Sequence, residues 1–220
     1  MNNIFDINTF DGVIFDLDGT LIDSMGVWNQ IDIDFLGKRG LKVPDDYLEK
    51  ITPMGYEAAA DYTIERFGFN ETRDDLVKEW YSMAIDAYSN HVKLKNGVKE
   101  YLEFLKQNGK VMSVATASDR ELVIPVLTNN KVLEYFHNIT TVREVKRGKG
   151  YPDIYNEAAK KMNINSEKCI VFEDILAGLK GAKAGNYRTV GVFDKLSRES
   201  EELLRENSDK FIYDFREMIN

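Results

Sequence analysis

Cysteine and histidine, the usual residues of disulfides and of many metal sites, are almost absent from this sequence. The chain of 220 residues contains one cysteine and two histidines, so an internal disulfide is excluded. Cys169 lies in an apolar run, which predicts a buried and unreactive thiol, because reactive thiols need an accessible, electropositive setting. His91 and His137 have no sequence neighbours at the spacing of metal ligands, and we expect both to be surface or structural residues.

Long apolar segments and an excess of positive charge are absent as well. No apolar run approaches the roughly 20 residues needed to cross a bilayer. The first ten residues lack the basic and apolar regions of a secretory signal. The net charge of -8 argues against non-specific binding to nucleic acids or anionic membranes. We therefore expect a cytoplasmic protein without a nucleic-acid or membrane partner, either a monomer or a weak homodimer.

Short apolar runs alternate along the chain with longer segments of helical periodicity. The runs are nearly continuous in apolar residues, which is typical of parallel strands covered on both faces. We expect strands at Gly12–Leu17, Val111–Thr116, Asn138–Thr141, Cys169–Glu173, Arg188–Phe193 and Lys210–Tyr213. Between them lie a helix that ends at Asn108-Gly109, one that opens at Pro152 and one at Leu176–Ala184. The alternation predicts the α/β class, with a doubly wound, Rossmann-like parallel sheet.

One long segment breaks this alternation. From residue 25 to residue 90 the pattern is helical, and we expect helices at Val27–Lys38, Tyr47–Ile51, Tyr56–Phe67 and Thr72–Tyr88. Thr72 and Asp75 have the spacing of a capping box at the start of the last helix. We expect residues 25–90 to form a helical cap domain, inserted into an α/β core domain made of residues 1–24 and 91–220.

Two carboxylates lie at the end of the first expected strand. Asp16 and Asp18 lie two residues apart and precede Gly19. Alternate residues of an extended segment point to the same side, and ligands gather at the carboxyl ends of strands in a parallel sheet. The pair is therefore suited either to sharing a metal ion or to dividing the roles of nucleophile and acid/base.

Further polar residues occupy the ends of other expected strands. Thr116 ends the second strand, Lys149 follows the third, and Glu173 and Asp174 end the fourth. Because the carboxyl ends of parallel strands open on one edge of the sheet, we expect these groups to converge with Asp16. Taken alone, each has a simpler explanation, since Asp-Gly is a common turn and an acidic pair can cap the next helix.

The motifs and their order resemble the haloacid dehalogenase-like superfamily of phosphohydrolases over nearly the whole chain. The four motifs of that family match Asp16–Thr20, Thr116, Lys149 and Glu173-Asp174. The helical insertion resembles the C1 cap of the phosphoglycolate phosphatase and β-phosphoglucomutase branches. The resemblance implies a phosphatase that hydrolyses a small phosphorylated metabolite with Mg²⁺. It makes Asp16 the nucleophile that forms an aspartyl-phosphate, and Asp18 the general acid and base.

The resemblance also implies two sets of ligands. The magnesium ligands are Asp16, the backbone carbonyl of Asp18, Asp174 and, directly or through water, Glu173. The phosphate contacts are Lys149, Thr116 and the nearby backbone N–H groups around Ala117.

Two positions depart from the family pattern. Gly150 follows Lys149 where a proline is usual, which leaves Lys146 as a competing candidate, although the spacing to Pro152 favours Lys149. Ile175 replaces the serine that usually follows the acidic pair, which removes one hydroxyl contact and leaves the metal carboxylates in place.

Three other functions stay open. A phosphomutase of the β-phosphoglucomutase type often has an apolar residue and a cap histidine where this chain has Thr20 and Trp28, which favour hydrolysis. A metal-free dehalogenase is disfavoured by Asp18 and Asp174. A non-catalytic binding module on the same fold is disfavoured because every catalytic position is filled.

Overall fold

The computed structural model describes residues 4–51, 54–197 and 199–219 of the chain. The chain forms two compact units. The first combines residues 1–25 with residues 92–220, and the second consists of residues 26–91. No helix within the described ranges combines the length and the apolar character needed to cross a membrane.

The first unit is built around one parallel sheet of six strands in the order β3-β2-β1-β4-β5-β6. The strands are β1 (Gly12–Phe15), β2 (Val111–Thr116), β3 (Phe136–Thr141), β4 (Cys169–Glu173), β5 (Arg188–Val192) and β6 (Lys210–Ile212). In the central register, Phe15 of β1 lies opposite Val114 and Phe172. The strands that carry the expected polar residues are therefore neighbours, because β1 lies between β2 and β4.

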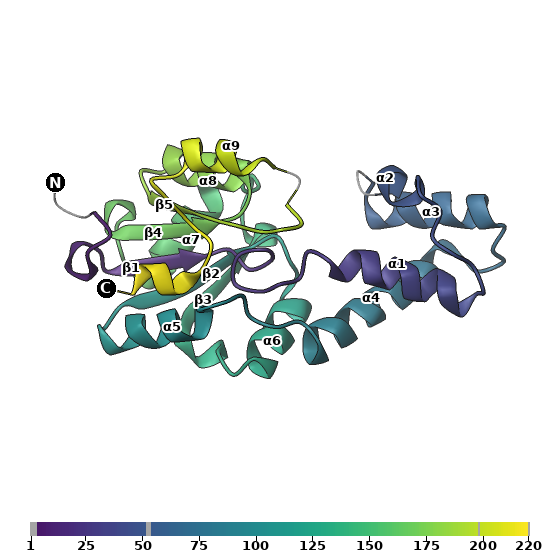
Figure 1. Ribbon diagram of the computed structural model, residues 1–220, viewed down its shortest axis with the longest axis horizontal. Coiled ribbons are helices and arrows are strands. Elements are labelled where there is room, and N and C mark those ends of the chain that lie inside the picture. Colours follow the sequence, from purple (N-terminus) through teal and green to yellow (C-terminus); the bar gives the residue numbers. More distant parts are fainter. Residues whose placement is uncertain (1–3, 52–53, 198, 220) are drawn as a thin grey trace. The chain divides into compact units, whose positions relative to one another are not determined.

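Helices cover both faces of this sheet, and Figure 1 shows α8 and α9 on one side with α5 and α6 on the other. The helices are α5 (Val98–Gln107), α6 (Arg120–Asn129), α7 (Asp153–Met162), α8 (Leu176–Ala184) and α9 (Glu201–Asn207). Short 3-10 helices are η1 (Ile7–Thr9), η2 (Leu133–Tyr135), η3 (Val142–Glu144), η4 (Ser166–Lys168) and η5 (Phe215–Met218). The predicted α/β class with a doubly wound parallel sheet is confirmed.

Consecutive residues of β1 point to opposite faces of the sheet and pack against different helices. Ile14 belongs to a buried cluster with Ala115 and with Tyr155 of α7. Phe15 points to the other face, where its ring stacks on Phe172 at 5.0 Å and meets Tyr101 of α5 edge-on at 6.2 Å. Both residues are fully buried. Burial of each large apolar side chain contributes about 1.5–3 kcal/mol, so this strand is firmly held where it leads into Asp16.

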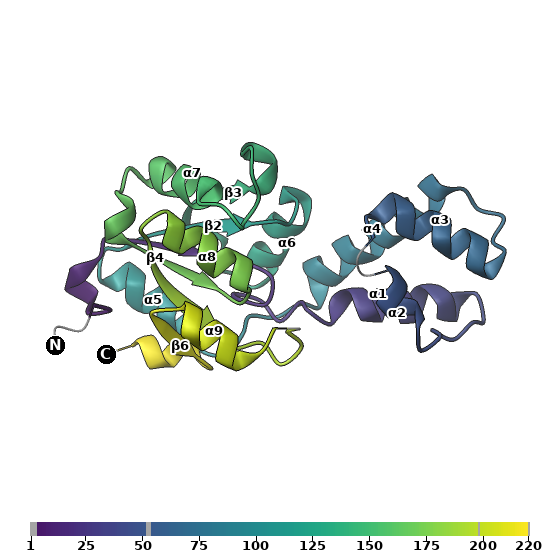
Figure 2. The same ribbon diagram turned by 90° about the horizontal axis from the view of Figure 1, so that it is seen from above.

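The second unit is helical in every described part that has regular structure. It contains α1 (Val27–Lys38), α2 (Tyr47–Ile51), α3 (Tyr56–Phe67) and α4 (Arg73–Asn90). Helix α4 packs against both α1 and α3 (Figure 2), and Phe35 of α1 meets the ring of Trp80 of α4 at 5.3 Å. The capping box predicted at Thr72 and Asp75 is confirmed, with both reciprocal hydrogen bonds present.

Several details of the first unit differ from the sequence predictions. Strand β3 starts at Phe136 rather than at Asn138, and β5 and β6 each end one residue earlier than predicted. Helix α6 lies in a segment for which no helix was expected, because Pro125 lies inside it and proline disfavours helix interiors. Strand β1 ends at Phe15 rather than at Leu17, because the chain turns immediately after it. The carbonyl of Leu17 accepts hydrogen bonds from the backbone N–H groups of Thr20, Leu21 and Ile22, which closes a tight loop.

Candidate active site

Three acidic side chains meet at the carboxyl edge of the sheet. Asp16 directly follows β1, Glu173 is the last residue of β4, and Asp174 comes next. One carboxylate oxygen of each lies within 4.8 Å of the other two, and none of the three residues is more than 3% exposed. Burial of like charges this close together is unfavourable unless a positive charge compensates them.

Lys149 supplies one such positive charge. Its Nζ forms ion pairs with Oδ1 of Asp16 and, at 2.8 Å, with Oε1 of Glu173. Burial opposes the charged form, but the two carboxylates raise the pKa of the Lys149 ammonium above its ordinary value. Lys146, the competing candidate from the sequence, instead lines a surface cavity with Arg143.

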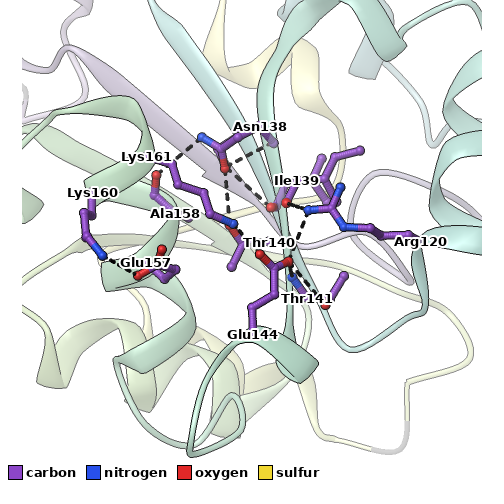
Figure 3. A network of polar contacts seen from close by, with 12 residues as sticks. Arg120, Asn138, Ile139, Thr140, Thr141, Glu144, Glu157, Ala158, Lys160 and Lys161 are labelled. Carbon is purple, nitrogen blue, oxygen red and sulfur yellow. Dashed lines mark hydrogen bonds and ion pairs between the residues drawn. The ribbon is translucent and has the colours of Figure 1, made fainter.

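The loop that carries Lys149 is anchored at its start by the polar network drawn in Figure 3. Glu144 accepts hydrogen bonds from the backbone N–H of Thr141 at 2.9 Å, from Lys161 at 2.6 Å and from Arg120 at 3.2 Å. Partial burial opposes ionisation, yet these donors lower the pKa of Glu144 to about 2. The carboxylate thus ties the end of β3 to α6 and α7 before the chain reaches Lys149.

Helix α8 fixes the other side of the same loop through a glycine. A Cβ atom at Gly181 would lie 2.0 Å from the backbone oxygen of Lys149, much closer than any real contact. Only glycine allows the helix to approach the loop this closely. The position of Lys149 therefore depends on a residue that has no side chain.

Glu173 is held by two donors on one oxygen. Its Oε1 accepts a hydrogen bond from the hydroxyl of Tyr155 at 2.7 Å, in addition to the contact with Lys149. Its Oε2 is buried without a hydrogen-bond partner among the described residues. A Cβ atom at Gly178 would lie 2.3 Å from the Glu173 carboxyl carbon, so α8 leaves room for this side chain. Burial, partly offset by Lys149, raises the pKa of Glu173 to about 7.

Asp174 shows the same division between a satisfied and an unsatisfied oxygen. The hydroxyl of Thr20 donates to its Oδ1 at 3.0 Å, whereas Oδ2 is buried and unpartnered within the described part of the chain. Burial and the neighbouring carboxylates of Asp16 and Glu173 raise its pKa well above the ordinary value. Gly19, at φ +78, lies against this oxygen, and a Cβ atom there would be 2.2 Å from Oδ2.

The unpartnered oxygens provide a test of whether a metal ion fits this site. Glu173 and Asp174 each keep one buried oxygen without a partner among the described residues, and all the side-chain donors of the cluster are carboxylate oxygens. Mg²⁺ is a hard cation that prefers oxygen ligands, and a divalent charge would compensate the excess of carboxylates over Lys149. The residues present therefore suit Mg²⁺.

Asp18 has a separate set of partners. Its Oδ1 accepts a hydrogen bond from Ser24 at 2.7 Å, and its Oδ2 accepts one from Ser118 at 2.6 Å. Ser118 in turn donates its backbone N–H to Oγ1 of Thr116 at 3.0 Å. The cluster of three carboxylates thus does not include that of Asp18, and metal binding through its backbone carbonyl stays a prediction.

The residues expected to bind phosphate lie at the end of β2. Thr116 is fully buried and Ala117, which follows it, is exposed. The structure brings Thr116 to Asp18 through Ser118, and it brings Lys149 to Asp16 directly. Phosphate binding by Thr116 and Ala117 itself stays a prediction.

Sequence reasoning did not assign a role to Tyr155, Ser24 or Ser118, although each holds a site carboxylate. The sequence gives a weak indication that the serines belong to the site, because each follows a motif residue within a short loop. The sequence gives almost no such indication for Tyr155, since a tyrosine in the first turn of a helix is commonly a core-packing residue.

The fold and the site define an α/β protein whose parallel sheet carries buried carboxylates and a lysine at its carboxyl edge. A family model described as haloacid dehalogenase-like hydrolase matches residues 13–192. The chain therefore belongs to the haloacid dehalogenase-like hydrolases, as the motifs predicted, and is an enzyme of that family.

Several known proteins are similar to this chain over most of their length. It is 25% identical over 181 residues to hexitol phosphatase B of Escherichia coli (strain K12), covering 81% of this chain and 82% of that protein. It is 27% identical over 188 residues to a phosphorylated carbohydrates phosphatase of Thermotoga maritima, covering 85% and 87%. A Thermotoga maritima crystal structure, provisionally assigned as a beta-phosphoglucomutase, superposes with a TM-score of 0.84 at 24% identity, covering 96% and 97%. The last likeness confirms the fold.

Proposed function

We propose that this protein is a Mg²⁺-dependent phosphatase that hydrolyses the phosphomonoester of a small sugar or sugar alcohol. The observation that carries the proposal is the contact between Asp16 and Lys149, beside two buried carboxylates that each keep an unpartnered oxygen. The substrate class is taken from the relatives, which are named as phosphatases of hexitols and of phosphorylated carbohydrates.

Asp16 is the proposed nucleophile. It attacks phosphorus to form an aspartyl-phosphate while the bond from phosphorus to the substrate oxygen breaks. That oxygen takes a proton from Asp18 and the substrate leaves as an alcohol. Carboxylate and phosphate repel one another, by about 4 kcal/mol for two unit charges 4 Å apart at an effective dielectric constant of about 20. The ammonium of Lys149, fixed on Asp16 and Glu173, opposes this repulsion at the position where the negative charges meet.

Asp18 is the proposed acid and base. In its protonated form it gives a proton to the leaving oxygen, and it then takes a proton from the water that hydrolyses the aspartyl-phosphate. The hydroxyls of Ser24 and Ser118 each bind one of its oxygens. They fix the orientation of the carboxyl group, which matters because proton transfer requires hydrogen-bond distance to the reacting oxygen.

Asp16, Asp174, the backbone carbonyl of Asp18 and Glu173 are the proposed magnesium ligands. When bound, Mg²⁺ supplies positive charge that draws carboxylate and phosphate together and polarises the phosphoryl group. Thr20 and Gly19 position Asp174, whereas Tyr155 and Gly178 position Glu173. Thr116 and the backbone near Ala117 complete the proposed phosphate contacts.

We propose that the inserted helical segment, residues 25–90, acts as the cap domain that selects the substrate. Its aromatic and basic side chains form internal clusters, as in the pair of Trp28 and Tyr56, whose rings lie 5.4 Å apart. Trp28 stands where the related mutases often have a histidine. This substitution, together with Thr20, favours hydrolysis over phosphoryl return to a second hydroxyl.

The test is a kinetic screen of the purified chain against phosphates of hexoses, pentoses and their alcohols, with inorganic phosphate as the product measured. We expect release with Mg²⁺ and loss of release in EDTA. Turnover that persists in EDTA would contradict the metal requirement. Conversion of β-glucose 1-phosphate to glucose 6-phosphate with a bisphosphate activator, in place of phosphate release, would show a mutase instead.

A further inference from the structure

Lys95 binds the loop between Asp18 and Thr20. Its Nζ donates hydrogen bonds to the backbone oxygens of Gly19 and Phe193, both at 2.6 Å, and to Oδ2 of Asp194 at 2.9 Å. These three acceptors use all three protons of the ammonium. The side chain of Lys95 is 13% exposed and that of Asp194 is 2% exposed.

The backbone around Lys95 is fixed on the same loop. The N–H of Lys95 donates to the carbonyl of Leu21, and the N–H of Asp23 donates to the carbonyl of Lys93, both at 2.9 Å. Residues 21–23 and 93–95 thus run side by side, with a bridge between Ile22 and Leu94. The ammonium then reaches back to Gly19, so backbone and side chain of one residue hold both ends of the turn.

The peptide held by Lys95 is the one that touches Asp174. Gly19 lies against Oδ2 of Asp174, the oxygen left without a partner in the described chain. The next residue, Thr20, donates its hydroxyl to Oδ1 of the same carboxylate. A shift of the Gly19 peptide therefore moves both contacts of Asp174 together. Asp18, which precedes Gly19, moves with them.

We propose that Lys95 is a positioning residue for the metal-binding loop. Its ammonium fixes the Gly19 carbonyl and thereby holds Asp18 and Asp174 in the arrangement that binds the cation. The proposal rests on the proposed function for its kinetic consequence, but its consequence for cation binding is independent of turnover. Neither the four family motifs nor the cluster of acidic residues includes Lys95.

The design of the test must separate positioning from the burial of an unpaired charge. Lys95→Met alone leaves Asp194 buried without its cation, which is strongly destabilising in general. The double variant Lys95→Met/Asp194→Asn removes both charges and keeps the approximate shape of both side chains. Asp194→Asn alone leaves the two bonds from Lys95 to carbonyl oxygens in place.

Lys110 provides a matched control. Its Nζ also donates to a backbone oxygen at 2.6 Å, that of Phe10, but at the amino end of the sheet. Lys110→Met therefore removes a comparable lysine–carbonyl bond far along the strands from the proposed site. The full-length chain is used for every variant.

The first measurement is Mn²⁺ binding by titration calorimetry, with the unfolding temperature of each variant recorded in parallel. We expect the double variant to bind Mn²⁺ about tenfold more weakly, the usual effect of losing a group that orients a metal ligand. Asp194→Asn and Lys110→Met should bind as the native chain does. Native Mn²⁺ affinity in a folded double variant would overturn the proposal.

The second measurement is turnover of p-nitrophenyl phosphate at saturating metal. We expect kcat of the double variant to fall at least about tenfold with KM nearly unchanged. If Lys110→Met lowers kcat to the same extent as the double variant, Lys95 is structural only and the proposal is also overturned. If the native chain hydrolyses no phosphomonoester, the proposed function fails, while the Mn²⁺ comparison still decides the role of Lys95.

Discussion

The hydroxyl of Thr20 donates a hydrogen bond at 3.0 Å to Oδ1 of Asp174, a residue 154 positions away along the chain. The contact joins the loop after β1 to the end of β4, because these strands are neighbours in the sheet. It also leaves the other oxygen of Asp174 facing Gly19. The relationship makes the geometry of the loop after β1 a determinant of the proposed metal binding.

Gly19→Ala should abolish Mn²⁺ binding while the chain stays folded. The new methyl group would lie 2.2 Å from Oδ2 of Asp174, and the backbone at φ +78 is strained for alanine. Titration calorimetry of the purified variant with Mn²⁺ measures the effect. Gly150→Ala is the matched control, since nothing lies within 4 Å of a Cβ at that position. Native affinity in Gly19→Ala would show that the loop yields and that Asp174 is not constrained by it.

Asp16→Asn should lower kcat for p-nitrophenyl phosphate by about 10³-fold or more, because an amide does not serve as the nucleophile. Intact-mass measurement after rapid acid quench should detect a phosphorylated species in the native chain and none in the variant. Asp11→Asn, just before the amino end of the same strand, should retain native kcat. Turnover by Asp16→Asn at the native rate would remove Asp16 from the proposed role.

Ser118→Ala and Ser24→Ala should each lower kcat by roughly tenfold to a hundredfold. Each removes one hydrogen bond to the Asp18 carboxylate, and bonds to charged groups contribute about 1.5–3 kcal/mol. Because the loss is in orientation of the acid and base, kcat should fall more than KM rises. Ser82→Ala, an exposed position on α4, serves as the control and should match the native chain. Unchanged kcat in both variants would contradict the proposed role of Asp18.

Asp32→Asn should stabilise the helical unit at neutral and alkaline pH. Burial raises the pKa of Asp32 from 3.8 to about 7. The folded chain therefore keeps a proton between about pH 4 and pH 7 that the unfolded chain has lost. Native stability should accordingly fall as the pH rises through this window. The gain from Asp32→Asn should grow over the same window and level off above it, at no more than about 4 kcal/mol.

Tryptophan fluorescence measures this effect selectively, because both tryptophans, Trp28 and Trp80, lie in residues 26–91. Urea unfolding followed at several pH values gives the free energy of unfolding of that unit. Asp34→Asn, exposed on the same helix, is the control and should show no comparable pH-dependent gain. A gain for Asp32→Asn that is independent of pH would contradict titration of Asp32 as its source.

The sequence predicted the parallel sheet well because its strands are fully buried and therefore nearly continuous in apolar residues. Val111–Thr116 and Cys169–Glu173 were predicted with the bounds that the structure has. The convergence of Asp16, Glu173 and Asp174 followed from strand ends, since parallel strands present their carboxyl ends on one edge, whereas Lys149 was selected by its spacing to Pro152.

Other features were beyond pattern reasoning for physical reasons. The bond from Tyr155 to Glu173 and the bonds from Lys95 to Gly19 and Asp194 depend on how side chains pack across distant segments. No periodicity in the sequence encodes such contacts. Helix α6 was missed because Pro125 lowers local helical propensity, whereas packing of Leu122, Val123, Val126 and Leu127 in the core overrides it.

Helix α8 gives the site two positions at which volume, rather than chemistry, is under constraint. Gly178 faces Glu173 and Gly181 faces the Lys149 backbone. One face of α8 therefore sets the distance between Lys149 and Glu173, although neither residue of this ion pair belongs to the helix. At these two positions the smallest exchange, a single methyl group, already exceeds the space present. Engineering of this enzyme should therefore leave this face of α8 untouched.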